Sequence, residues 1–494
     1  MTAGRSLWPI GGCFGLLLAG CSIYPPHHFM PAAPLTCSFA HEQQAKAPLA
    51  SCWWEAFGSK QLDELVSSAF LGNHDLKQLY ARLKAAQAAV GVAGSLLWPQ
   101  LGWQASATRY WTKASEVVVE TGGINQLDEA TVVGSGGATG AGATGVAPSA
   151  FSQYLLQFPL SYEIDLWGRI RNQVAAAQHR AASDFWAYNE GACLVAASVV
   201  DSWFTLAEHK ALLELLAEQI KTNKTLVDLL EVRFSVGEAF AVDVYQQRLQ
   251  LLQTQTEVPP VRSRYETTLH QLYLLLGMAP HLIDPPISSL QLVDLPPFPD
   301  LATPFELMQR RPDLKAAYQR LLAADREVAA ALADRLPQFS LAALWQFAGN
   351  SLSQLFQQQL ASLGLNIMAP LLDGGRRQAE VMRRCALTEE ALEAFTQALL
   401  IAIREVEDAI VQEEQLKKLI EEVRQELKVA ESTLEAAQLQ YAHGLSDYLP
   451  VIAALQSVQR LQRQQISQKK DLLINRSRLY RALGCFFAEK SFNP

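Results

Sequence analysis

Residues 416–444, LKKLIEEVRQELKVAESTLEAAQLQYAHG, decide the fold of this 494-residue chain. Apolar side chains recur there at intervals that alternate between four and three residues, which is typical of a coiled-coil seam. The glycine at position 444 follows, and glycine enters a left-handed turn without steric cost. The stretch therefore predicts a long helix that ends in a tight turn at His443-Gly444. The seam positions are Leu416, Ile420, Val423, Leu427, Ala430, Leu434, Ala437 and Tyr441.

The same pattern occurs 207 residues earlier, with its turn at Val236-Gly237. Each outgoing helix lacks proline, from Gly168 to Gly237 and from Gly375 to Gly444, and about 65 residues give a rod of roughly 100 Å. A constant offset over so long a hairpin indicates an internal duplication. Helices of this length must pack along their sides, and a cytoplasmic coiled-coil rod is one structure that they could form. The earlier seam is Leu213, Leu216, Ile220, Asn223, Val227, Leu230 and Phe234.

The N-terminus has the features of a secretory signal in residues 1–20. Arg5 precedes an apolar run, and small residues lead to Leu18-Ala19-Gly20-Cys21. This ending resembles the lipobox of bacterial lipoproteins, in which the cysteine after the cleavage site is acylated. The resemblance predicts lipidation of Cys21 and, because Ser22 stands where an aspartate favours the inner membrane, delivery to the outer membrane. An ordinary signal peptide with an incidental cysteine is the alternative.

The composition of the remaining chain argues against several classes of protein. A net charge of −8 gives no support for a nucleic-acid partner. The cysteines that remain after Cys21 are odd in number and have no CxxC spacing, which argues against a metal site or a disulfide framework. A bridge between Cys37 and Cys52 stays open. No run of eighteen apolar residues follows Cys21, so no transmembrane helix is expected.

Four short segments change from the helical period to a period of two, at 101–112, 152–162, 338–347 and 360–369. The pattern suits strands of a membrane β-barrel with lipid outside and water inside, and equally a half-buried sheet of a soluble domain. Four strands cannot close a barrel, and an open sheet edge is not tolerated in lipid, so a barrel would need several chains. Their apolar faces are Leu101, Trp103, Ala105, Ala107 and Trp111; Tyr154, Leu156, Phe158, Leu160 and Tyr162; Phe339, Leu341, Ala343, Trp345 and Phe347; and Ala361, Leu363, Leu365 and Ile367.

The duplication also organises the rest of the chain. A short helix from Asp75 to Gln100 recurs from Asp313 at an offset of 238, so an insertion of 31 residues lies in the first copy. It corresponds to the glycine-rich stretch 121–148, which we expect to be an extracellular loop. Val258-Pro259-Pro260 should break the returning helix of the first copy.

We therefore divide the chain into six parts along the sequence. After the signal peptide come a lipidated tether and equatorial segment (21–73), repeat 1 (74–277) and a proline-rich linker (278–312). Repeat 2 (313–484) and a C-terminal tail (485–494) complete the chain. Within each repeat, two short helices stacked end to end should match the length of the long helix.

Four motifs, in order, resemble the outer-membrane efflux factors of the TolC/NodT type. They are Trp53-Trp54-Glu55-Ala56-Phe57, Asn73 with Asp75-Leu76, SYEIDLWGR at 161–169, and Arg311-Pro312-Asp313-Leu314. The resemblance implies a mainly α-helical fold with a membrane β-barrel, in which a homotrimer forms twelve strands and a helical tunnel crosses the periplasm. It further implies a passive exit duct in the outer membrane, which receives small molecules from an inner-membrane pump through a periplasmic adaptor protein.

The resemblance also assigns roles to the hairpin ends. The residues there would contact the adaptor: Val236, Gly237, His443, Gly444 and Leu445. Family members often carry acidic residues six positions beyond the turn glycine, where they narrow the tunnel. Asp243 fits this position, but the second repeat has Pro450 there, with Asp447 nearby. A favourable charge at a helix N-terminus is the alternative role for both aspartates.

The sequence gives no reason to expect catalysis, a metal or a cofactor, because no catalytic or nucleotide-binding motif is found. Asp165 and Arg169 are expected to form an ion pair at a helix start. Two functions are left: a passive conduit in contact with outer-membrane lipid, and a structural periplasmic coiled-coil lipoprotein without channel activity. The alternating strands favour the conduit, since a bridging rod needs none.

Overall fold

The computed structural model describes residues 52–111, 150–280, 290–301 and 303–484. Cys21, Cys37, the glycine-rich stretch 121–148 and the tail 485–494 lie outside the described residues. The chain divides into two compact units. The smaller unit includes residues 93–171 and 332–377, and the larger unit holds the remaining helical parts of the chain.

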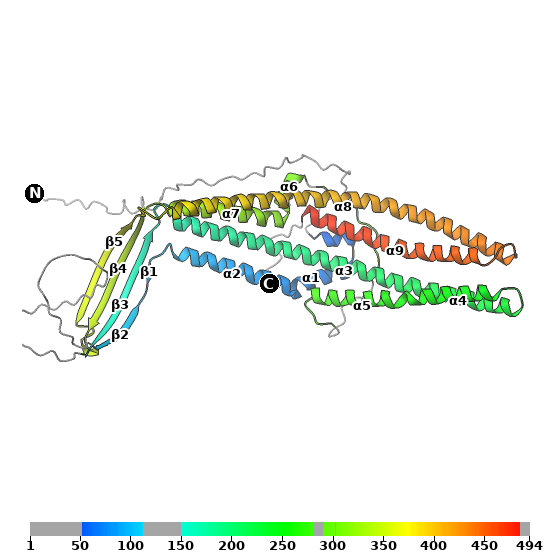
Figure 1. The fold of residues 1–494 in the computed structure, drawn as a ribbon, viewed down its shortest axis with the longest axis horizontal. Helices are drawn as coiled ribbons and strands as arrows, with labels where there is room; N and C mark the ends of the chain where they lie inside the picture. Colours follow the sequence, from blue (N-terminus) through cyan, green and yellow to red (C-terminus); the bar gives the residue numbers. More distant parts are fainter. Residues whose placement is uncertain (1–51, 112–149, 281–289, 302, 485–494) are drawn as a thin grey trace, which may run out of the picture. The chain divides into compact units, whose positions relative to one another are not determined.

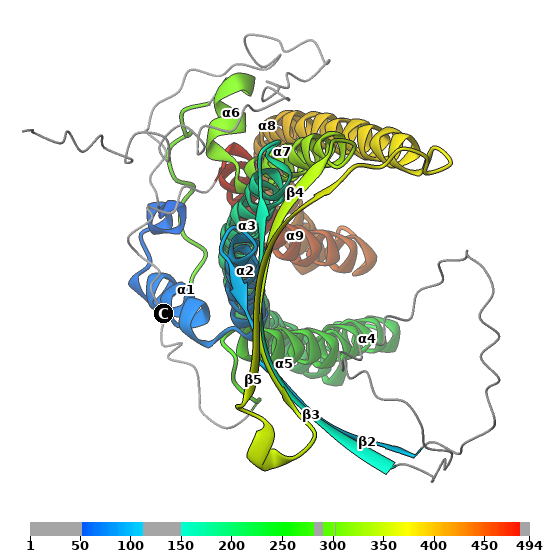
Figure 2. The same cartoon turned by 90° about the vertical axis from the view of Figure 1, so that its left-hand side faces the viewer.

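The smaller unit is an antiparallel sheet, whose strands lie side by side in the order β2, β3, β4, β5 (Figure 1). Figure 2 shows the same strands curving along their length. Strand β1 pairs with β3 in line with β2, because Leu101 lies opposite Leu160 and Gln104 opposite Gln157 in one unbroken register. The predicted four strands are therefore confirmed, with the first one interrupted beside Pro159, which has no N–H to donate to the ladder. The bounds are β1 Gln100–Leu101, β2 Gln104–Trp111, β3 Ala150–Ile164, β4 Gln338–Gly349 and β5 Gln358–Met368, with the 3-10 turn η3 at Leu352–Gln354.

The helices include two of 67 residues, α3 (Arg169–Ser235) and α8 (Arg376–Ala442), as the proline-free stretches predict (Figure 1). The returning helix of repeat 1 is divided into α4 (Ala241–Thr256) and α5 (Val258–Leu275), because Pro259 and Pro260 begin a new helix. Its counterpart α9 (Leu449–Leu483) is continuous. The other helices are η2 Trp53–Phe57, α1 Lys60–Gly72, α2 His74–Ser95, α6 Pro304–Arg310 and α7 Pro312–Ala333.

The predicted seam of α8 is buried or half-buried along its whole length, with Val423 3% and Ala437 6% exposed. The seam of α3 ends earlier than predicted. Leu230 is buried against Val244 of α4, whereas Phe234 is 50% exposed. The inclusion of Phe234 was wrong for the single chain, because its side chain is half exposed in the last turn of α3.

In each repeat, the residue before the short helix contacts the end of the returning helix in the same way, which confirms the duplication in three dimensions. Asn73 Nδ2 donates to the carbonyl of Leu275 at 3.0 Å, and Arg311 Nη1 donates to that of Ala482 at 3.1 Å. The donors are 238 residues apart and the acceptors 207, the two offsets found in the sequence. At the first joint the backbones touch, since a Cβ on Gly72 would lie 2.0 Å from the Leu276 carbonyl oxygen.

The core of the larger unit surrounds the η2 motif. The ring of Trp53 stacks on Tyr480 with centroids 5.9 Å apart, and Phe57 meets Phe204 edge-on at 5.0 Å. Helix α3 contains a window that could cross a membrane by length and composition, but 61% of this window is buried inside the chain. It is therefore packed as a core helix.

Candidate functional sites on the sheet and at the hairpin ends

One face of the sheet is mainly apolar, with Arg109, Ser152 and Gln359 as polar exceptions. Residues directly opposite one another share a face. Leu156 lies opposite Ala105 and Phe347, and Trp345 lies opposite Phe158 and Ala361. The register thus brings the predicted apolar positions of all four strands onto one face. On β5 this face is highly exposed, at 74% for Leu363 and 60% for Ile367, as suits contact with lipid.

The opposite face is mainly polar. Gln157 lies between Gln104 and Gln346, and its Nε2 donates to Gln346 Oε1 at 3.0 Å. Further along, Ser340 lies between Glu163 and Asn366. This side also carries apolar side chains, namely Leu155, Leu344, Leu360, Met368 and the stacked pair of Tyr110 and Phe151. One face for hydrocarbon and one for water is the arrangement of a membrane-barrel wall.

Both outer strands of this wall have an open edge within the described chain. Strands β1 and β2 pair only with β3, and β5 pairs only with β4. With 15 residues in β3, 12 in β4 and 11 in β5, three of the strands are long enough to cross a bilayer, which takes about 9–11 residues. Each open edge has backbone groups available to pair with another strand.

The SYEIDLWGR motif forms the connection from β3 to α3. Asp165 accepts hydrogen bonds from the backbone N–H groups of Ile170 at 3.1 Å and Arg171 at 2.8 Å. Arg169 instead binds Glu163 through two hydrogen bonds of 3.0 and 2.6 Å. The expected Asp165–Arg169 pair is therefore wrong, because the carboxylate of Asp165 is used to cap the helix. Asp373 repeats this cap before α8, where the backbone N–H of Arg377 lowers the pKa of its carboxyl group.

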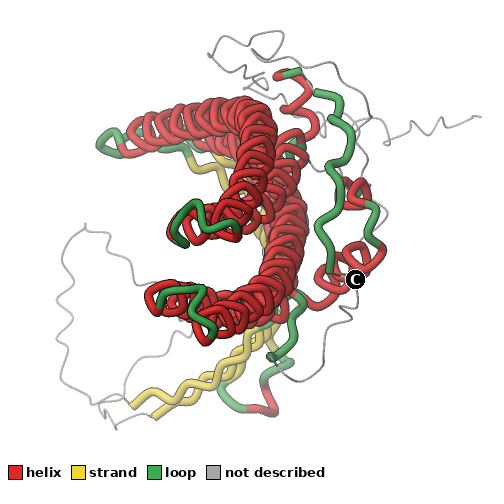
Figure 3. The backbone as a smooth tube through the Cα atoms, turned by 90° about the vertical axis from the view of Figure 1, so that its right-hand side faces the viewer, coloured by secondary structure: helices red, strands yellow, loops and turns green. Residues whose placement is uncertain are grey.

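The two hairpin turns have the same geometry and lie at the same end of the larger unit (Figure 3). Gly237 has φ +82° and Gly444 has φ +70°. The N–H after each glycine returns to a carbonyl five residues earlier, at 2.8 Å in the first turn and 2.9 Å in the second, which is a Schellman ending. Val236 is 65% and Leu445 77% exposed, and His443 is exposed as well. The predicted adaptor-contact residues thus lie on exposed turns.

The two gate candidates differ in their surroundings. Asp243 is 7% exposed, and its Oδ2 accepts from the Phe240 N–H at 3.2 Å and from the Tyr441 hydroxyl at 3.3 Å. It therefore caps α4, which is the alternative role considered above, and it also links the two hairpins. Asp447 is exposed, just before α9. Burial, and then the charge of Asp243, raise the pKa of Tyr441.

A tyrosine that sequence reasoning missed completes the hairpin end. The Tyr448 hydroxyl donates to Gln247 Oε1 at 2.7 Å, and its ring meets Tyr441 at 5.0 Å. Tyr448 could have been predicted from its helical spacing to Val451 and Ile452, because this spacing extends the apolar stripe of α9 back to the turn. We call this buried group the tip cluster: Leu230, Val244, Ala437, Tyr448, Val451 and Ile452.

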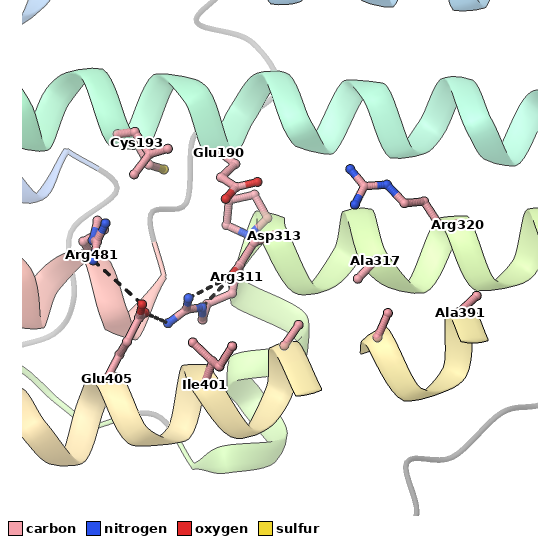
Figure 4. A pocket seen from close by; sticks show the side chains of 14 residues that line it. Glu190, Cys193, Arg311, Asp313, Ala317, Arg320, Ala391, Ile401, Glu405 and Arg481 are labelled. Atoms are coloured by element: carbon pink, nitrogen blue, oxygen red, sulfur yellow. Dashed lines mark hydrogen bonds and ion pairs between the residues drawn. The ribbon is translucent and has the colours of Figure 1, made fainter. Parts of the chain in front are cut away.

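A pocket of about 430 Å³ opens in the larger unit where the start of α7 approaches α3, α8 and the end of α9 (Figure 4). Arg311 binds Asp313 at 2.7 Å and Glu405 at 2.8 Å, and Arg481 lies 3.9 Å from Glu405. Burial and Asp313 raise the pKa of Glu190 on the opposite wall. The Arg311-Pro312-Asp313 motif is thus a joint that holds α7 to α8 and α9.

No group of three or more metal-ligating side chains occurs within the described ranges. At the joint, the charged side chains of Arg311, Asp313 and Glu405 are paired with one another. At the hairpin ends, the side chains are apolar or hydrogen-bonded. The structure therefore provides a sheet with one face for lipid and one for water, and long helices that pack along their sides.

Comparison with known proteins agrees with this geometry. The family described as outer membrane efflux protein matches residues 65–278 and 304–485, which cover both repeats. The chain is 27% identical over 471 residues to the pyoverdine export outer membrane protein OpmQ of Pseudomonas putida KT2440, covering 95% of each chain. It is 24% identical over 485 residues to the cation efflux system protein CusC of Escherichia coli K12, covering 96% of this chain and 98% of CusC.

Solved structures share the fold. The outer-membrane channel OprN superposes with a TM-score of 0.81 at 23% identity, covering 94% of this chain and 99% of that one. The CmeC outer membrane channel of Campylobacter jejuni gives a TM-score of 0.80 at 21% identity, covering 96% of each chain. The expectation that this protein is not an enzyme agrees with these relatives. The chain belongs to the outer membrane efflux protein family and is an exit duct of an efflux system.

Proposed function

We propose that three copies of this chain form one duct, with a twelve-stranded barrel in the outer membrane. The observation that carries the proposal is a two-faced sheet of four strand positions whose outer edges are both open. Unpaired backbone groups are not tolerated in hydrocarbon, so β5 of one copy must pair with β2 of the next. Three copies give twelve strands, well above the eight needed for closure.

The duct acts passively, and its cargo is supplied by an inner-membrane pump through a periplasmic adaptor. The exposed apolar turn residues Val236 and Leu445 are the surface that the adaptor contacts. Relatives of similar identity are named for different cargoes, pyoverdine in OpmQ, cations in CusC and toluene in TtgF. Cargo selection therefore belongs mainly to the pump.

The hairpin ends form the gate of the duct. Tyr441, Asp243 and the tip cluster hold the two hairpins of one chain together, and copies of Asp447 around the axis favour cations. We expect the closed duct to conduct weakly and to prefer cations. The double variant Asp243→Asn, Asp447→Asn should lose this preference in single-channel recordings. An unchanged preference and conductance would exclude both residues from the gate.

Lipid attached to Cys21 anchors each copy to the outer membrane. Intact-mass analysis of protein from its native host should show loss of residues 1–20 and the added mass of lipid. Cys21→Ser should abolish the lipid, whereas Cys385→Ser, which alters an exposed cysteine of α8, should keep it. Mature protein without lipid would refute the anchor.

Assembly is tested by light scattering of the protein in mild detergent. Three chains per particle are expected, with a mass corrected for bound detergent. A stable, folded monomer at micromolar concentration would overturn the duct, because one sheet cannot enclose a pore.

A further inference from the structure

The seam between the two hairpins of the larger unit contains a buried layer of neutral amides. Helix α4 lies beside α9, and α3 packs against both. Here the side chains are polar although the position is internal: Asn223 is 0%, Gln247 0% and Gln459 3% exposed. We define the amide layer by its members: Gln219 and Asn223 of α3, Gln247, Gln250 and Thr254 of α4, and Gln459 of α9.

Gln459 is the centre of this layer. Its Nε2 donates to Asn223 Oδ1 at 3.0 Å, and its Oε1 accepts from Gln250 Nε2 at 2.9 Å. Its backbone carbonyl accepts from Gln219 Nε2 at 3.2 Å. One side chain and its backbone thus connect α9 to both helices of the other hairpin.

The surrounding members complete the pairing. Asn223 Nδ2 donates to Thr254 Oγ1 at 2.9 Å, and Gln247 receives the Tyr448 hydroxyl from the tip cluster. At the other end, Arg463 is the charged side chain that joins the layer. It donates to Gln219 Oε1 at 2.9 Å and pairs with Glu257 at 3.3 Å.

The layer lies between two apolar clusters of the same seam. On one side is the tip cluster, and on the other side are Leu212, Leu216 and Val261. Apolar contacts tolerate small shifts, since they have no direction. Buried amides do not, because each unpaired donor or acceptor costs the desolvation of that group. A shift of one hairpin along the other would therefore separate several hydrogen bonds at once.

We propose that Gln459 is a positioning residue that fixes the register of the two hairpins and so holds the duct closed from within each chain. This inference rests on the proposed function. Gln459 lies ten residues beyond Leu449, the first residue of α9, which is about 15 Å along the helix, so the closing force acts well behind the turn. The six members of the layer carry no ionisable side chain, and the charged pair of Arg463 and Glu257 bonds the layer at Gln219 and not at Gln459, so the hydrogen bonds of the Gln459 side chain should not change with pH where Asp and His titrate.

The test compares single-channel conductance of purified variants in a planar lipid bilayer. Gln459→Leu removes the donor to Asn223 Oδ1 and the acceptor of Gln250 Nε2, and the open-to-closed ratio should rise about tenfold, which corresponds to about 1.4 kcal/mol. Gln438→Leu is the matched control, because Gln438 lies exposed on α8 of the same hairpin. It should conduct like the wild type.

A second variant tests the hydrogen bonds themselves. Gln459→Glu is nearly the same shape, and its protonated form keeps an O–H donor. The duct should stay closed at low pH and open when the carboxylate ionises, although Arg463 one turn away will extend the ionised range downward. The wild type should show no such added pH dependence.

The results separate the inference from the proposed function. Channels that form in all variants but conduct like the wild type at every pH would overturn the role of Gln459 and leave the duct intact. Folded trimers that form no channel in any variant would overturn the duct itself. Replacing Asn223, Gln250 and Gln459 together by leucine removes the directional contacts of the layer, so this variant should open as readily as Gln459→Leu, and a closed duct would overturn the role of the layer.

Discussion

At the scale of single residues, several side chains have roles that their type alone does not reveal. Asp165 and Asp373 each cap a helix start and also pair with an arginine there, Arg171 at 3.2 Å and Arg377 at 3.5 Å. Asp243 combines a cap with a bond to Tyr441. In each case the carboxylate first satisfies free N–H groups at a helix start, where they have no partner within the helix.

Asp201 of α3 should make stability depend on pH. Burial raises the pKa of its carboxyl group to about 6, against the pull of Arg478. The folded state therefore holds the proton more tightly than the unfolded state, and stability falls as the pH rises from about 4 to about 6. The full loss is about 3 kcal/mol.

Asp201→Asn removes this titration. Its melting temperature, followed by circular dichroism in detergent, should exceed that of the wild type at pH 7.5 and match it at pH 4. Asp228→Asn, an exposed aspartate on the same helix, serves as control. A wild-type melting temperature that does not fall between pH 4 and 7 would contradict the burial of an ionised Asp201.

Gly444 should not tolerate a side chain, for conformational reasons alone. Its φ of +70° costs a β-branched residue roughly 1–3 kcal/mol, although a Cβ would meet no atom within 4 Å. Gly444→Val should thus impair efflux in cells while trimers persist. Gly91→Val, inside α2 and also with open space at its Cβ, should be nearly neutral. Equal efflux from both variants, scored by cargo sensitivity, would show that the turn geometry is dispensable.

At the scale of helices and strands, the sequence predicts the features that depend on local residue patterns. The seams, the helix break at Pro259, the turns and the four strand positions follow from apolar spacing and from proline and glycine, because these act locally. The amide layer was not predictable in this way. Gln250 and Gln459 have the composition of a solvated helix face, and only the neighbouring helix makes them internal. The prediction for Phe234 was wrong for the opposite reason: its side chain is apolar, yet it is half exposed at the end of α3.

A buried ion pair that the sequence did not indicate helps to hold the proline-rich linker. Arg476 of α9 and Glu413 of α8 are each 1% exposed as side chains and 2.6 Å apart. Arg476 Nη1 also donates to the carbonyls of Pro296 and Pro297 at 2.6 and 2.7 Å. Burial opposes ionisation of Glu413, but the hydrogen bonds from Arg476 lower its pKa overall.

Removal of this arginine should therefore be costly. Arg476→Leu leaves Glu413 with Lys417 alone and both carbonyls without a donor, and we expect about 3 kcal/mol of destabilisation. Arg460→Leu, which breaks an exposed pair with Glu426, should cost less than about 1 kcal/mol. Thermal unfolding of the two variants in the same detergent gives the comparison. Similar melting temperatures would mean that the linker is held by other contacts.

At the scale of the whole molecule, one duplicated chain supplies both kinds of wall that a duct needs. Each repeat contributes two strand positions and one long hairpin. The strands have a lipid face and a water face, whereas the hairpins are joined by an apolar seam and the amide layer. Neither wall closes on itself within one chain, and this is why the function depends on assembly.

The most direct test of the duct is ion conduction by the purified protein in a planar lipid bilayer. Folded trimers, checked by light scattering before insertion, should produce discrete current steps of uniform size that are small in the wild type and prefer cations. The steps should disappear when the protein is heat-denatured before addition. If folded trimers insert and the bilayer shows no discrete steps at any voltage, the chain does not form a duct.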